Sequence, residues 1–357
     1  MSNKVNGYLS KKISHYMFVL TLMVVFIHVS GYMRDKLYVG ELRYEWNVFI
    51  EIFGQGITRV AVPLFFVISG ILAFSKENIN ESVLINGGIK RLKTLGITYI
   101  IWNIIYAVYN IICYEFIDNI DILSQISFWD VIDIIFNHKY NSVFWYVQQL
   151  LIISFLSPII YKLIKNKNIF IVFAVITFIL NLAYKYIPYI DIVFPGAFFY
   201  FLGAGIALHF NNIIDKPAKK HTIALSLIVL LLMQLFRIWI VSTYPDDTSR
   251  ISVFHRLYET LTPVVFWYAF DFIKFEKCKI LFFEKHTFMV YASHIILVSF
   301  ISANMIVRLL HLYSQNIMVS VVIFIAISFF VYFLISGFSY LLNKFFPKIQ
   351  SILTGGR

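Results

Sequence analysis

A histidine lies within the first apolar run of the chain, where an ionisable side chain is costly. His28 falls about 12 residues into a helix expected over residues 16–33, roughly 18 Å along its axis and past the middle of a membrane. A neutral imidazole can take a proton from an alcohol and return it, the role of a general base in acyl transfer. A buried histidine bonded to a backbone carbonyl or a neighbouring helix is the plainer alternative.

Other polar residues in apolar segments could assist such a base. Arg59 is expected at a depth similar to that of His28, where a cation can stabilise an oxyanion or simply snorkel from a helix end. The pair Ser69-Gly70 permits close approach of another helix. Trp145, at the start of an expected helix, and His294, inside another, are candidates for substrate binding, although ordinary packing explains them equally well.

A basic cluster precedes the third expected helix. Lys90, Arg91 and Lys93 could hold the phosphates of a nucleotide-like donor through charge-assisted hydrogen bonds. They could equally be ordinary basic residues at the cytoplasmic end of a helix.

The composition predicts the elements that must position these residues. Of 357 residues, 60% are hydrophobic and 14% are charged, whereas a soluble domain carries about 25% charged residues. The apolar runs of about 17 to 25 residues are each long enough to cross a bilayer as a helix. We therefore expect an all-α polytopic membrane protein, a single membrane domain over 1–357 without a separate soluble domain. Its ten transmembrane helices are expected near 16–33, 56–75, 94–115, 143–164, 169–186, 195–210, 222–241, 258–274, 287–308 and 317–343.

The distribution of basic residues predicts the orientation. With the N-terminus inside, every segment expected in the cytoplasm carries at least three lysines or arginines, as the positive-inside rule requires. Both termini are then cytoplasmic, and the loop over 115–141 lies outside. The net charge of +11 would meet anionic lipid headgroups rather than nucleic acid. Cys113 and Cys278 fall on opposite sides, which excludes a disulfide between them, and no metal site is readable.

Six stretches of sequence carry a family resemblance. They are Val24 to Tyr32 (VVFIHVSGY), Arg59 to Gly70 (RVAVPLFFVISG), Lys90 to Trp102 (KRLKTLGITYIIW), Val143 to Pro158 (VFWYVQQLLIISFLSP), Gly196 to Leu208 (GAFFYFLGAGIAL) and Phe288 to Leu297 (FMVYASHIIL). Taken in order, they resemble the acyltransferase-3 family of bacterial membrane acyltransferases. This family includes the membrane halves of O-acetylases and of serine racemases of the vancomycin-resistance type.

The resemblance implies a function and roles for three residues. Members transfer an acyl group, usually acetyl from cytoplasmic acetyl-CoA, to a hydroxyl of a cell-envelope glycan or lipid-linked sugar. His28 matches the essential histidine of the family and Arg59 a recurrent arginine. Arg91 matches basic residues associated with the CoA donor. The implied location is the bacterial cytoplasmic membrane.

The chain departs from the family pattern at one position. Met17 stands where the pattern has an arginine, with ten residues between that position and the histidine. Lys12 or His15, within two helical turns, could replace that cation and contact the donor. Otherwise the chain uses a different donor or has lost transferase activity.

Two other functions fit the same composition. A transporter or exporter of an amino acid or glycan intermediate would also need buried polar residues in a helical bundle, although no inverted repeat is visible. A membrane sensor or scaffold is the third option, without a soluble output domain in the sequence. The sequence leaves the oligomeric state open, with a homodimer as one option.

Overall fold

The computed structural model describes residues 7–36, 43–117, 120–121, 123–183, 194–244, 248–301 and 316–356, all within or between helices. Short 3-10 or π-helical segments are labelled η. The first half of the chain forms α1 (Gly7–Lys36), α2 (Arg43–Phe49), η1 (Ile50–Gly54), η2 (Ile57–Val60), α3 (Ala61–Phe74), α4 (Glu81–Arg91), η3 (Leu92–Gly96), α5 (Ile97–Ile112), η4 (Cys113–Ile117), η5 (Leu123–Gln125), α6 (Phe128–Phe136), η6 (Ser142–Phe144), α7 (Trp145–Ile164) and α8 (Lys167–Ala183). The second half forms α9 (Phe194–His209), α10 (Asn211–Ile214), α11 (Lys220–Thr243), α12 (Thr248–Ala269), η8 (Phe275–Lys277), η9 (Phe282–His286), α13 (Thr287–Ile301), α15 (Ile317–Phe345) and α16 (Pro347–Thr354).

Several of these helices can cross a membrane, which confirms the prediction of an all-α, multi-pass membrane protein. Among the described residues, six segments are long and apolar enough, and two shorter apolar helices accompany them. The six are Gly7–Met33, Ile50–Phe74, Glu81–Glu115, Ser142–Ile164, Lys220–Thr243 and Ile317–Phe345, and the shorter ones are Lys167–Leu182 and Gly196–His209. A count of ten and a cytoplasmic location of both termini stay predictions. The expected helix over 287–308 extends beyond the residues that the structure describes.

Several predicted boundaries were wrong. The helix expected over 16–33 begins at Gly7, and the helical segment expected over 94–115 begins at Glu81. The helix expected to start at residue 258 begins ten residues earlier, at Thr248, because charged residues in its first half lower the hydropathy without ending the helix. The loop expected over 115–141 contains α6. Ser127 accepts a hydrogen bond from the Asp130 backbone while the Asp130 carboxylate accepts one from the Ser127 backbone, a capping box that starts this helix.

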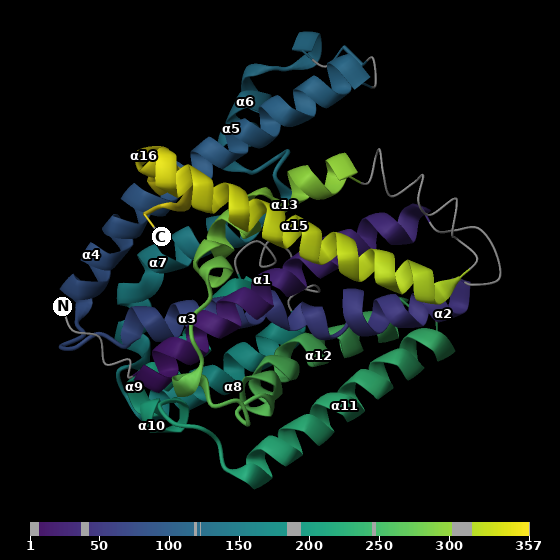
Figure 1. Cartoon of the computed structure of the whole chain (residues 1–357). Coiled ribbons are helices and arrows are strands. Elements are labelled where there is room, and N and C mark those ends of the chain that lie inside the picture. Colours follow the sequence, from purple (N-terminus) through teal and green to yellow (C-terminus); the bar gives the residue numbers. More distant parts are fainter. Residues whose placement is uncertain are drawn as a thin grey trace.

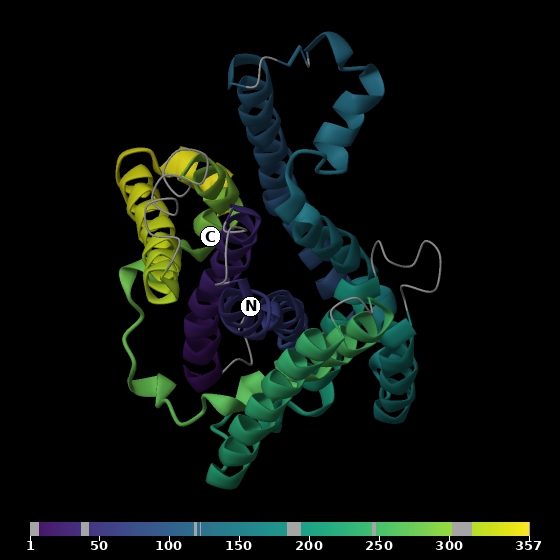
Figure 2. The same cartoon turned by 90° about the vertical axis from the view of Figure 1, so that its right-hand side faces the viewer.

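The core of the bundle forms where α3 lies along α9. A Cβ atom on Gly70 would stand 2.2 Å from the carbonyl oxygen of Tyr200, and one on Gly203 would stand 2.1 Å from the carbonyl oxygen of Val67. Each glycine therefore lets the other backbone approach, which confirms the close packing predicted for Gly70. Helix α1 contacts α3 on one side and α13 and α15 on the other (Figures 1 and 2).

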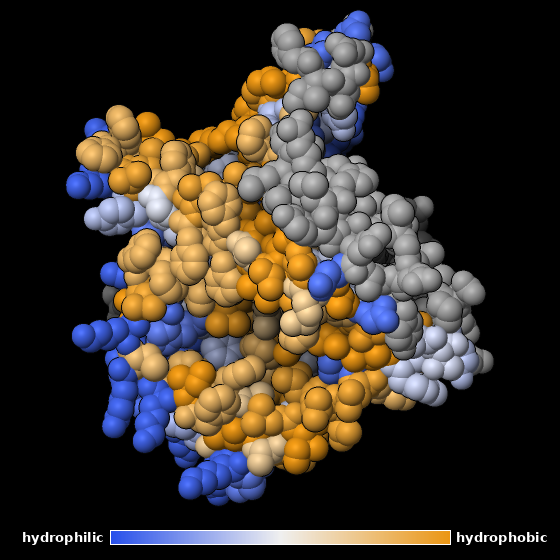
Figure 3. Space-filling view, turned by 45° about the vertical axis from the view of Figure 1, so that its right-hand side comes forward, coloured by the Kyte–Doolittle hydropathy of each residue, from blue (hydrophilic) through white to orange (hydrophobic). Residues whose placement is uncertain are grey.

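The outer surface is largely apolar. Figure 3 shows a broad hydrophobic surface, with hydrophilic residues gathered along one edge of the molecule and at a projecting tip. That tip is formed by α5 and α6, which extend away from the other helices (Figure 2). Exposed Leu, Ile and Phe side chains along α11 and α15 suit contact with lipid, because lipid tails are as apolar as they are.

One end of the bundle is closed by α16. The carbonyl oxygen of Ile352 accepts a hydrogen bond from Thr98 at 2.7 Å, and that of Leu353 accepts one from the Trp102 indole at 2.9 Å. These bonds attach α16 to α5. We call this end, at which α1 also begins, the α16 end.

Candidate active site

Two histidines from distant parts of the chain lie side by side. The rings of His28 in α1 and His294 in α13 have centroids 5.0 Å apart. The His294 side chain is fully buried, and its Nδ1 lies 2.8 Å from the carbonyl oxygen of Tyr291 and 3.1 Å from that of Val290. Because carbonyls only accept, Nδ1 carries the proton and Nε2 is an acceptor. Within the described part of the chain, this Nε2 atom is buried and has no hydrogen-bond partner.

Helix α13 is held in position by the residue one turn before His294. The Tyr291 hydroxyl donates to the carbonyl oxygen of Val143, just before α7. The Tyr291 ring also contacts the His294 ring, with centroids 6.4 Å apart. Tyr291 therefore connects the histidine pair to the start of α7, where Trp145 and Tyr146 lie.

A polar cavity opens beside the histidine pair in the half of the bundle away from α16. Its volume is about 300 Å³. We call it the Arg59 cavity, and its lining consists of Ile27, Arg59, Val62, Pro63, Phe66, Trp145, Gln149, Gly196, Phe199 and Glu259. Since Ile27 precedes His28, the cavity reaches α1 next to the histidine. It brings Arg59 and Trp145, both predicted site residues, into one space.

Arg59 is tied to α1 through Gln55. The Arg59 Nη2 atom donates to the Gln55 Oε1 atom at 2.5 Å. The Gln55 amide in turn donates to the carbonyl oxygen of Ile27 at 3.2 Å and to the Ser30 hydroxyl at 3.1 Å. Gln55 lies in the turn between η1 and η2, four residues before Arg59, and both residues lie beside α1. The sequence analysis missed Gln55.

A second charged residue of the cavity, Glu259, is held by a chain of polar groups that the sequence analysis also missed. His255 Nε2 lies 2.8 Å from the Glu259 carboxylate, and His255 Nδ1 accepts from Arg237 at 2.6 Å. Arg237 also pairs with Glu51 at 2.7 Å. The chain therefore joins η1, α11 and α12. The spacing of His255 and Glu259 by four residues was the signal in the sequence.

A narrower cleft opens at the α16 end. It has a volume of about 90 Å³, and we call it the α16 cleft. Residues of α1, α3, α7, η9, α13 and α16 line it, namely Met17, Thr21, Phe65, Tyr146, Lys285, His286, Thr287, Phe288, Met289, Tyr291 and Thr354. The Tyr146 ring contacts the ring of Phe66, which lines the Arg59 cavity, with centroids 4.7 Å apart. This aromatic pair is thus a shared wall between the two spaces.

The predicted basic cluster lies apart from the histidines. Arg91 donates to the Ser154 hydroxyl at 2.8 Å, and it lines a cavity of about 70 Å³ together with Lys76. Burial lowers the pKa of the Lys76 ammonium, and the charges of Arg91 and Lys90 lower it further. Lys90 and Lys93 themselves are exposed on α4 and η3. The cluster gathers cations, so it suits an anion.

The two residues suggested as replacements for the missing arginine are both paired with carboxylates. The Lys12 ammonium is fully buried, lies 2.5 Å from Asp271 and sits over the Trp267 ring at 4.2 Å. His15 Nδ1 lies 2.7 Å from Glu284. Met17 instead lines the α16 cleft. Lys12 and His15 therefore connect α1 to the segments that follow α12.

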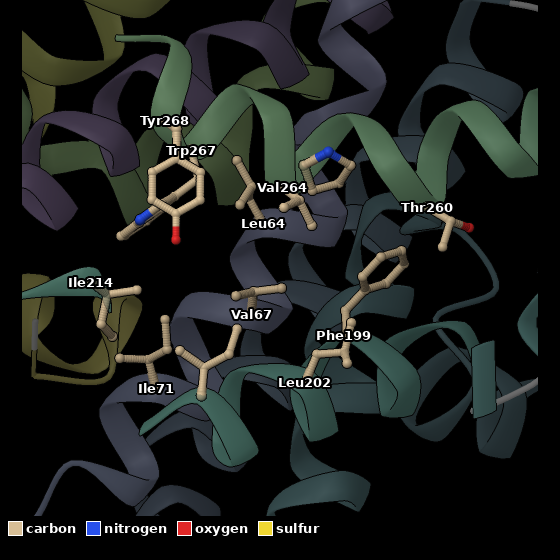
Figure 4. Close-up of a pocket in the computed structure, with 12 residues that line it drawn as sticks. Leu64, Val67, Ile71, Phe199, Leu202, Ile214, Thr260, Val264, Trp267 and Tyr268 are labelled. Carbon is tan, nitrogen blue, oxygen red and sulfur yellow. The ribbon is translucent and has the colours of Figure 1, made fainter. Parts of the chain in front are cut away.

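An apolar cavity of about 60 Å³ lies between α3, α9 and α12 (Figure 4). Leu64, Val67 and Val264 are among its lining residues. The Thr260 hydroxyl at its edge donates to the carbonyl oxygen of Arg256 and accepts from Asn181. The cavity offers hydrocarbon rather than reactive groups. No cluster of three or more His, Cys, Asp or Glu side chains suited to a metal ion occurs among the described residues.

Comparison with known proteins gives one match. A family model described as an acyltransferase domain matches residues 18–341. No curated protein and no solved structure matches the chain.

Proposed function

Because this chain belongs to the acyltransferase-3 family, we propose that it moves an acetyl group from acetyl-CoA to a hydroxyl of a cell-envelope glycan or lipid-linked sugar. The observation that supports this proposal is the position of the His28–His294 pair. It lies beside the Arg59 cavity and, through Tyr291, beside the α16 cleft. Two substrates that approach from opposite sides of a membrane can meet at such a pair.

His28 is the general base of the proposed reaction. It takes the proton from the acceptor hydroxyl as the oxygen attacks the thioester carbonyl carbon. The new C–O ester bond forms, the C–S bond breaks, and the CoA thiolate takes the proton from the His28 imidazolium. General-base catalysis of this kind is worth about 10²- to 10⁴-fold in rate.

His294 is a positioning residue in this mechanism. Its Nε2 atom is an acceptor that lies in the ring facing His28. An acceptor there favours the His28 tautomer with a proton toward His294 and leaves the other nitrogen free to act as the base. It also stabilises the imidazolium that forms during the reaction.

The Arg59 cavity is the proposed acceptor site. Its volume of about 300 Å³ is at the lower end of the range for small-ligand pockets. The Trp145 ring can cover the C–H face of a sugar, while the Glu259 carboxylate and the Gln149 amide can bond to its hydroxyls. Arg59 supplies positive charge for the oxyanion of the tetrahedral intermediate.

In this proposal the α16 end faces the cytoplasm of a bacterium, with ten spans in its plasma membrane and both termini inside. The donor arrives at that end. The cluster of Lys76, Lys90, Arg91 and Lys93 is one candidate for holding its phosphates. Lys12 and His15 are weaker candidates, because each is already paired with a carboxylate.

The proposal is tested with purified protein in detergent, acetyl-labelled acetyl-CoA and a lipid-linked sugar fraction as the acceptor. His28→Ala is expected to bind acetyl-CoA like wild type and to lose label transfer by about 10²-fold or more. His221→Ala, which removes an exposed histidine from α11, is the control. Label transfer by His28→Ala at the wild-type rate would contradict the mechanism. Absence of acetyl-CoA binding by wild type, together with solute uptake into proteoliposomes, would favour a transporter.

A further inference from the structure

A lysine outside the predicted site lies at the entrance of the α16 cleft. Lys285 is the next-to-last residue of η9, its side chain is exposed, and it contributes to the cleft lining. The neighbouring Glu284 carboxylate is directed elsewhere, because it pairs with His15 and accepts from the Leu281 backbone. The Lys285 charge is therefore available to an anion at this entrance.

The interior of the cleft suits a thin, mostly apolar chain. Met17, Phe65, Phe288 and Met289 present hydrocarbon and thioether groups, while a few hydroxyls come from residues such as Thr21. The volume is under a third of that of the Arg59 cavity. The space is too small for a nucleotide, and its apolar lining suits a thin, extended arm.

The cleft extends from Lys285 to Tyr291, one ring contact away from the histidine pair. Tyr291 lines it, and the Tyr291 ring contacts His294, which faces His28. Along α13, the rise from Thr287 to His294 is roughly 10 Å, and along α1 the rise from Met17 to His28 is roughly 16 Å. An extended pantetheine arm of roughly 20 Å spans either distance.

We infer that the α16 cleft is the passage for the acyl-carrying arm of the donor, and that Lys285 binds the phosphate group at the outer end of that arm. This inference rests on the proposed function and adds a donor site to it. The ligand chemistry is a phosphorylated thioester whose arm enters the cleft while the phosphate stays at the surface. The acetyl group then arrives beside His28.

The α4 cluster is the alternative position for the same phosphate. The small cavity of Lys76 and Arg91 shares no lining residue with the α16 cleft. Two hydroxyl residues of its lining, Ser157 of α7 and Tyr200 of α9, bond to each other at 2.9 Å. These contacts connect the small cavity to α7 and α9 rather than to the histidines. The geometry therefore favours Lys285 as the contact nearest to the arm.

The experiment measures binding of acetyl-CoA to the full chain in detergent. Lys285→Ala is expected to weaken binding by about tenfold, because it removes a charge-assisted contact to phosphate. Lys285→Arg should keep most of the affinity. Lys279→Ala removes an exposed lysine of the preceding segment that does not line the cleft, and it should bind like wild type.

Two further measurements show whether the effect is specific to the phosphate contact and to the cleft. Acetyl-pantetheine lacks the phosphate, so wild type and Lys285→Ala should bind it equally. Thr354→Trp narrows the cleft and should abolish binding of both ligands, with an unchanged thermal transition as the check on folding. Unchanged acetyl-CoA affinity in Lys285→Ala, beside a loss in Arg91→Ala, would overturn this inference and leave the proposed function standing. Absence of wild-type binding would overturn both.

Discussion

The Arg59 cavity and the α16 cleft lie on either side of one aromatic pair, yet they are built in opposite ways. The cavity is the larger, and charges of both signs, Arg59 and Glu259, line it. The cleft is narrow and largely apolar, with Lys285 at its entrance. A sugar acceptor must be selected by directional hydrogen bonds, whereas a carrier arm needs shape and one anchor. Under the proposed function, the fixed side-chain networks of the Arg59 cavity would therefore carry the specificity for the acceptor.

The largest expected effect concerns the packing beside the cleft rather than either substrate. Asp271→Ala leaves the buried Lys12 ammonium without its carboxylate and should destabilise the protein by about 3–5 kcal/mol. Thermal unfolding in detergent measures this change. The double variant Lys12→Met with Asp271→Asn removes both buried charges and keeps an acceptor for the Tyr8 hydroxyl, so it should recover part of the stability and bind acetyl-CoA like wild type. A loss of acetyl-CoA binding in a stable double variant would instead make Lys12 a donor ligand.

The next effect concerns the His28–His294 pair, which lies between the Arg59 cavity and the α16 cleft. His294→Phe keeps the ring packing but removes the Nε2 acceptor facing His28, so we expect about a 10²-fold lower turnover. The Michaelis constants for both substrates should change little, and the pH dependence of turnover should shift. Steady-state kinetics across pH separate this role from simple packing, which would leave the pH profile in place.

A smaller effect should be confined to the acceptor side. Glu259→Gln removes a charge that His255 holds and should raise the acceptor Michaelis constant by about tenfold. Acetyl-CoA affinity should stay the same. Equal losses for donor and acceptor would show that the two spaces are not separate sites.

The smallest effect is a pH dependence on the cleft side. Burial and the nearby Lys285 charge lower the pKa of the His286 imidazole, so His286 is neutral at pH 7 and gains charge only at pH values below its ordinary pKa of about 6.5. Acetyl-CoA affinity should therefore rise by a few fold as the pH falls below that value. His286→Gln should remove this part of the pH dependence in binding titrations between pH 5 and 8. An unchanged rise in this variant would contradict the role of His286, because protonation of the phosphate at low pH would weaken binding instead.

The apolar runs predicted most helices because lipid-facing and buried segments are both rich in hydrocarbon. The same criterion failed where polar groups are paired inside the fold, as in the first half of α12, where His255 bonds to Arg237 and to Glu259. It also failed for α6, whose start depends on two side chains, Ser127 and Asp130, rather than on hydropathy.

The sequence allowed individual candidate site residues to be selected, but it did not predict which of them lie next to one another. His28, Arg59, Trp145 and His294 could each be selected by type and depth. Their meeting depends on contacts of α1 with η2 and α13, and of α9 with both α3 and α7, which join elements far apart in the sequence and leave no local pattern. The Lys285 entrance was also hidden, because in the sequence it is one of many basic residues near helix ends.

The attachment of α16 to α5 has a consequence for the biosynthesis of the protein. Helix α16 follows every other described helix in the chain, so it leaves the ribosome after all of them. Until residue 354 has emerged and the carbonyls of Ile352 and Leu353 have met Thr98 and Trp102, one wall of the α16 cleft is missing. If the α16 cleft is the donor passage that we infer, a partly made chain can insert its helices before it can hold a donor.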